Sequence, residues 1–108
     1  MANTFKLKTK ANVGVSTSNV YTVPSATTTV VIGLTLANTS GSSINVGVGV
    51  TRASTDDVKL IKNVPIPQGS SFEFMAGNKV VLETTDTLTA ESDVSNSLDV
   101  ALTIMEIT

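Results

Sequence analysis

Alternation of apolar and polar residues runs along most of this chain and limits its possible folds more than any other feature. Residues 28–37, for example, place Val30, Ile32, Leu34 and Leu36 on one side. Successive side chains of a strand point to opposite faces of the sheet, whereas a helix repeats its apolar positions every three to four residues. Because the helical period is not found along the sequence, the chain is predicted to be all-β.

Turn-forming residues divide the chain into roughly eight or nine short strands, with a turn signal every 8–12 residues. That spacing is typical of an antiparallel β-sandwich, with jelly-roll and immunoglobulin-like connectivity both open. No linker or change of composition interrupts residues 1–108, so a single domain is expected. Residues 28–51 are predicted to form a β-hairpin around the polar run 38–43, and 76–78 to form a turn.

The strand predicted at the C-terminal end is apolar on both faces. Leu98, Val100, Leu102 and Ile104 occupy one face, and the other face ends in Met105 and Ile107. Such a strand is either central in a sandwich or covered by another subunit. Met105 and Ile107 are therefore candidate interface residues, whereas replacing Leu102 or Val48 should cost a few kcal/mol if they lie in the core.

Residues 4–8 form a second alternating segment, with Phe5 and Leu7 on one face and Lys6 and Lys8 on the other. This segment pairs within its own domain, or it adds as a strand to the sheet of a neighbour. Phe5 and Leu7 are interface candidates for that reason. The basic face, which Lys10 continues, is expected to be solvated, the alternative being a weak attraction to an acidic neighbour.

Gly47 and Gly49 alternate with valines on the outer face of the strand predicted at 44–51. Glycine weakens a strand and often marks a bulge or the close approach of another backbone. Both interpretations remain open, and the two glycines are included among the candidate interface residues.

The composition excludes most catalytic chemistry. The chain has no histidine and no cysteine, so the commonest general base, metal ligands and thiol nucleophiles are missing. Asp56 and Asp57 are the one adjacent acidic pair, and a solvated loop is favoured there over a Ca²⁺ site. We expect a protein that is not an enzyme and has no cofactor, nucleic-acid partner or membrane segment.

Six segments along the chain carry a resemblance to known proteins: residues 1–6 (MANTFK), 20–24 (VYTVP), 31–38 (VIGLTLAN), 64–71 (VPIPQGSS), 77–83 (GNKVVLE) and 102–107 (LTIMEI). Together they resemble a family of small virion proteins of tailed bacteriophages, especially those of marine cyanobacteria. The resemblance implies a structural component of the particle: a capsid decoration (cement) protein, or a piece of the neck, tail or fibre. It implies the major capsid protein or other virion proteins as partners, and assembly in the host cytoplasm. We expect a homo-oligomer, with a trimer favoured.

A carbohydrate- or receptor-binding module of a tail or fibre is the alternative. Sugar sites usually stack on aromatic rings, and this chain has one tyrosine, three phenylalanines and no tryptophan. Phe72 and Phe74 are expected in the core, which leaves Tyr21 as the aromatic candidate for a ligand.

Overall fold

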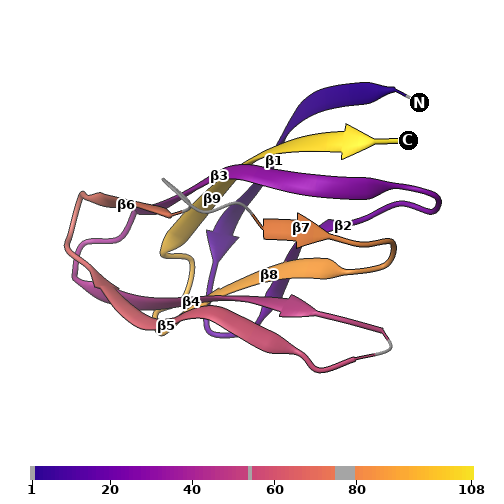
Figure 1. Cartoon of the computed structure of the whole chain (residues 1–108). Coiled ribbons are helices and arrows are strands. Elements are labelled where there is room, and N and C mark those ends of the chain that lie inside the picture. Colours follow the sequence, from indigo (N-terminus) through magenta and orange to yellow (C-terminus); the bar gives the residue numbers. More distant parts are fainter. Residues whose placement is uncertain (1, 54, 75–79) are drawn as a thin grey trace.

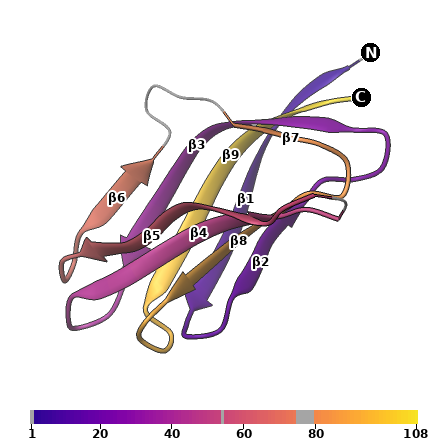
Figure 2. The same cartoon turned by 60° about the horizontal axis from the view of Figure 1, so that its bottom comes forward.

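The computed structural model describes residues 2–53, 55–74 and 80–108, and within them the chain forms nine strands and no helix. Two sheets pack face to face, and all strand pairs are antiparallel (Figure 2). The all-β sandwich predicted from the alternation is confirmed. The strands are β1 (Asn3–Val13), β2 (Ser18–Thr22), β3 (Thr28–Asn38), β4 (Ile44–Thr51), β5 (Val58–Ile66), β6 (Ser71–Phe74), β7 (Val80–Leu82), β8 (Thr87–Ser92) and β9 (Leu98–Ile107).

The strand order identifies the connectivity as a jelly roll. One sheet has the order β1-β9-β3-β6, with β7 also paired to β3, and the other has the order β2-β8-β4-β5 (Figure 1). Strands from the first part of the chain therefore pair with strands from the last part, as in an antiparallel ribbon rolled into two layers. This order settles the choice between the two connectivities that the sequence leaves open.

The hairpin predicted over residues 28–51 is not formed. β3 and β4 belong to different sheets, and residues 39–43 cross between the two layers. An arch between two sheets and a hairpin within one sheet require the same alternation, so the pattern alone does not separate them. The arch is fixed by bonds to other loops, since Asn38 N–H donates to Ser70 O and Thr39 N–H donates to Ser97 O.

The core lies between the sheets and is almost entirely aliphatic. On β9 the buried residues are Leu98, Val100, Leu102 and Ile104, as predicted. On β3 the prediction is partly wrong, because the pairing with β9 shifts between Val31 and Gly33. This irregularity buries Val31 and leaves Val30 and Ile32 half-buried. A bulge adds one residue to a strand and so exchanges its inner and outer positions.

Two further sequence expectations concern the segment after β5. Phe72 packs against the core as a half-buried residue. The side chain of Phe74 and the turn predicted at 76–78 lie outside the described residues.

Candidate interaction surface

A row of apolar side chains crosses the solvent side of the β1-β9-β3-β7 sheet. Phe5 pairs with Met105, Met105 with Val30, and Val30 with Val81, in direct register on four neighbouring strands. Directly paired residues of antiparallel strands present their side chains on the same face. Phe5 is 69% exposed and Val81 57%, so the row reaches solvent at both edges of the sheet, on β1 and on β7.

Leu7 and Ile107 extend this row into a face. Leu7, which is 63% exposed, pairs with Thr103, and Thr103 pairs with Gly33 on β3. Ile107 pairs with Asn3 on the other side of the row. We call this surface the outer face and define it by Phe5, Leu7, Val30, Val81, Met105 and Ile107.

Formal charge is confined to the margin of the outer face. On β1, β9 and β3, with the β3 irregularity taken into account, the outward positions carry one charged residue, Asp99, whose carboxylate accepts the Asn12 N–H at 3.0 Å. On the edge strand β6, Glu73 pairs with the outward Thr35 and adds a second charge at the margin. Contiguous apolar surface without charge is typical of a protein interaction site. Four predicted interface residues, Phe5, Leu7, Met105 and Ile107, thus lie together, and two residues that the sequence analysis missed, Val30 and Val81, join them.

Gly47 and Gly49 lie in the other sheet and are buried. The ion pair between Lys59 Nζ and Glu91 Oε1 (2.8 Å) joins the strands on either side of them. A Cβ on Gly49 would meet Val58 O at 2.9 Å, and the pairing of β4 with β5 is irregular at this point. Gly49 therefore admits a close strand within the chain, whereas a Cβ on Gly47 would meet its nearest atoms at an ordinary 3.5 Å. Both glycines are buried and offer no exposed surface to a partner, which corrects their inclusion among the interface candidates.

A polar cluster lies between the two sheets and joins side chains from β1, β2, β3 and β9. The Tyr21 hydroxyl donates to Glu106 Oε2 at 2.5 Å and bonds to the Thr29 hydroxyl at 2.8 Å, and Lys6 Nζ lies 2.8 Å from Glu106 Oε1. Lys8 Nζ lies 5.9 Å from the centroid of the Tyr21 ring. The lysine face of β1 lies on the sandwich side of its sheet, where Lys6 supplies the cation that the buried Glu106 carboxylate requires. Lys6 and Lys10 are nevertheless exposed and Lys8 is half-buried, so the prediction of a solvated lysine face holds in large part.

The Tyr21 cluster shifts the pKa of both of its acidic groups. Burial and the neighbouring Glu106 raise the pKa of the Tyr21 hydroxyl to about 12. Hydrogen bonds from Lys6 and Tyr21 outweigh burial and hold the pKa of the Glu106 carboxyl below its usual value. Tyr21 is 6% exposed, so its ring is not free to stack on a sugar, and the aromatic candidate for glycan binding loses its basis.

Because Tyr21 is the single tyrosine of the chain, its ionisation can be followed directly by ultraviolet absorbance. We expect a midpoint close to pH 12 in the folded protein and close to pH 10 in urea. With the folded pKa above the unfolded one, the stability that the protonated hydroxyl contributes is complete below pH 10 and is lost as the pH rises through about 12. The double variant Tyr21→Phe/Phe5→Tyr, with an exposed tyrosine, should titrate normally. A normal midpoint for folded Tyr21 would contradict the buried cluster.

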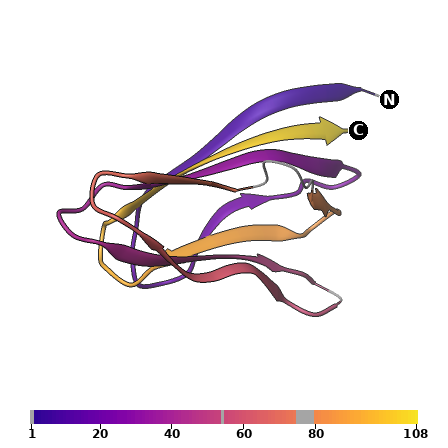
Figure 3. The ribbon, with the colours of Figure 1, turned by 60° about the vertical axis from the view of Figure 1, so that its left-hand side comes forward.

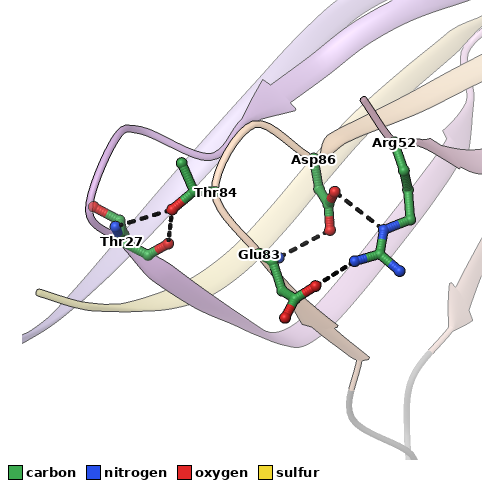
Figure 4. Close-up of polar contacts among 5 residues, drawn as sticks. All are labelled: Thr27, Arg52, Glu83, Thr84 and Asp86. Carbon is green, nitrogen blue, oxygen red and sulfur yellow. Dashed lines mark hydrogen bonds and ion pairs between the residues drawn. The ribbon is translucent and has the colours of Figure 1, made fainter. Parts of the chain in front are cut away.

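A second polar cluster joins the end of β4 to the turn between β7 and β8 (Figure 4). Arg52 Nε lies 3.1 Å from Asp86 Oδ1, and Arg52 Nη2 lies 2.5 Å from Glu83 Oε1. The other Asp86 oxygen accepts the Glu83 N–H at 2.9 Å. Beside it, the Thr84 hydroxyl donates to Thr27 O at 2.9 Å. With its carboxylates bonded to arginine and backbone, this cluster ties the two sheets together and is not arranged as a catalytic acid–base pair.

Asp56 and Asp57 form the acidic pair considered for Ca²⁺. Asp57 is bonded to the backbone, since its Oδ1 accepts the Arg52 N–H at 2.9 Å. The described residues hold no cluster of three or more acidic side chains that would suit a metal ion. Among the same residues there is no helix of the length and hydropathy that crossing a bilayer requires.

Comparison with known proteins shows a likeness of fold alone. A subunit of Bacillus endospore appendages, described as a novel family of disulfide-linked pili, superposes with a TM-score of 0.60 at 11% sequence identity. The superposition covers 99% of this chain and 87% of the other. No protein-family model and no curated protein sequence matches.

Proposed function

We propose that this chain is a non-enzymatic structural subunit of a tailed-bacteriophage virion, most specifically a capsid decoration protein that binds the major capsid protein as a homo-oligomer. The observation that carries the proposal is the outer face, where Phe5 and Leu7 are more than 60% exposed on a surface with little formal charge. An isolated domain gains nothing from exposing these side chains, whereas a contact with another subunit would remove their surface from water.

Two further points support an assembly role. Six segments spread along the chain resemble small virion proteins, and the fold resembles a protein that forms pili. The pili are described as disulfide-linked, whereas this chain has no cysteine. Assembly of this protein would therefore rest on noncovalent contacts, for which a broad apolar face is suited.

Placement in the particle separates the proposal from its alternative. Virions of the phage that encodes this chain are labelled with gold-conjugated antibody against the recombinant protein. Label distributed over the whole capsid is expected for a decoration protein. Label confined to the tail, neck or fibres would replace decoration by the tail-component alternative, and unlabelled particles that also lack the chain by mass spectrometry would overturn a virion role.

The outer face can be blocked without disturbing the fold. An added Cβ on Gly33 meets no atom within 4 Å, and the same holds for Gly41 in the loop between the sheets. We expect Gly33→Lys to place a charge in the middle of the outer face and to reduce binding to undecorated capsids at least tenfold, with little change in the melting temperature. Gly41→Lys is the matched control and should bind normally. Equal binding by both variants would contradict the role of the outer face.

A further inference from the structure

The N-terminal strand β1 is fixed almost entirely by its partner β9 and very little by the core. Of its residues, Val13 is buried and Lys8 half-buried, while Asn3 to Leu7 and Thr9 to Asn12 are exposed. Figures 1 and 3 show β1 beside β9, with the N-terminus and the C-terminus at the same end of the molecule. Across the sandwich, β1 contacts β2 and β8 far less than it contacts β9.

The edge of β9 is specific for a strand with the pattern of β1. Register runs without interruption from Asn3 opposite Ile107 to Lys10 opposite Val100. Within it, Lys6 supplies the cation for the carboxylate of Glu106, whose side chain is 7% exposed. A buried carboxylate without a cation is costly. The occupant of this edge must therefore present a cationic side chain at the position of Lys6, as β1 does in this chain and in every other copy of it.

A backbone irregularity separates residues 3–10 of β1, which we call the arm, from the rest of the domain. The pairing is irregular between Lys10 and Val13, and Asn12 lies in the left-handed region with φ 58°. Beyond this point the chain is anchored, because Val13 is buried and its carbonyl accepts the Ser97 N–H. A change of backbone direction at residues 11–12 would redirect residues 3–10 and leave the sandwich intact.

We propose that residues 3–10 of β1 exchange between copies, so that the arm of one subunit lies on β9 of a second copy in the register seen within the chain. The exchanged pairing repeats the hydrogen bonds, the Lys6–Glu106 ion pair and the contact of Lys8 with Tyr21, and therefore costs little beyond association itself. It brings Phe5 and Leu7 of one copy onto the outer face of the next. This inference names the contact behind the homo-oligomer of the proposed function and rests on that function only for its biological setting.

The absence of native cysteine makes the exchange measurable. Leu7 and Thr103 are direct partners on neighbouring strands, a separation that a disulfide can bridge. A Leu7→Cys chain and a Thr103→Cys chain are refolded together from urea and oxidised. We expect a covalent heterodimer at a yield at least fivefold above that of a control mixture of Thr22→Cys and Thr87→Cys chains, whose positions pair between β2 and β8. A yield equal to the control would overturn the proposal.

Charge reversal separates arm exchange from simple stacking of two outer faces. Adding Lys6→Glu to the Leu7→Cys chain should reduce the heterodimer, because two carboxylates then meet. Adding Glu106→Lys to the Thr103→Cys chain should restore it, since the reversed ion pair forms only between the two chains. A heterodimer yield that neither substitution alters would show that two outer faces stack on each other, and it would overturn the exchange. Virion labelling and capsid binding by the Gly33→Lys and Gly41→Lys variants test the proposed function separately. The outer face is also present in a monomer whose arm lies on its own β9, so these tests do not depend on exchange.

Discussion

Replacing Leu102 by alanine is expected to lower the free energy of unfolding by about 2–5 kcal/mol. Leu102 is fully buried in the middle of β9, between Lys8 of β1 and Leu34 of β3 in the pairing register. The substitution removes apolar contacts and leaves a cavity that the neighbouring strands fill only in part. Because small domains are stable by about 5–15 kcal/mol, the loss is a large fraction of the total.

Urea unfolding followed by far-ultraviolet circular dichroism measures this loss, with Thr39→Ala as the control. Thr39 lies in the loop between the sheets with its side chain exposed, and the bond from its backbone N–H to Ser97 O survives the substitution. The control should unfold at the same urea concentration as the wild type. A Leu102→Ala variant that is as stable as wild type would show that the inner face of β9 is wrongly assigned.

The second large effect is expected at Asn38, whose side chain holds the arch between the sheets. Its amide nitrogen donates to Ser42 O at 2.8 Å, Ile66 O at 3.0 Å and Pro67 O at 3.2 Å, and its amide oxygen accepts the Ser40 N–H at 2.9 Å. Asn38 is 4% exposed. Asn38→Ala leaves these groups without their partner and should destabilise the protein by about 2–4 kcal/mol, because each buried unsatisfied group costs about 1–3 kcal/mol.

Asn38→Asp tests the donor role of the Asn38 amide nitrogen separately from the acceptor role of its oxygen. The aspartate retains the oxygen that Ser40 bonds but places a second oxygen against the carbonyls of Ile66 and Pro67. We expect it to be at least as destabilising as alanine at neutral pH, with partial recovery as the carboxyl becomes protonated in acid. Thermal melts at both pH values measure this, and an aspartate variant with wild-type stability would contradict the donor role of the Asn38 amide.

Sequence periodicity predicted the sandwich and the inner face of β9 because both follow from the side-chain period of two. It failed where one residue breaks the period. At the β3 irregularity, Val31 turns inward in place of Val30, and this moves Val30 onto the outer face. A bulge depends on pairing with β9, which lies more than 60 residues further along the chain, so local alternation does not reveal it.

Long-range pairing also explains what was missed at the candidate site. The sequence marks Phe5 and Met105 separately as apolar residues near the two ends of the chain, and the jelly roll makes them direct partners. The cluster of Lys6, Tyr21 and Glu106 joins three distant segments and had no local signal. Gly47 and Gly49 were ambiguous because a glycine that admits a strand of its own chain and one that admits a partner look identical in sequence.

A cryo-electron microscopy map of the intact particle at side-chain resolution tests most directly whether the outer face is the surface by which this subunit is held in an assembly. The expected density places the β1-β9-β3-β7 sheet against a neighbouring subunit, with Phe5, Leu7 and Val81 buried and the β2-β8-β4-β5 sheet toward solvent. A subunit attached through the second sheet, with Phe5 and Val81 still in water, would contradict the account.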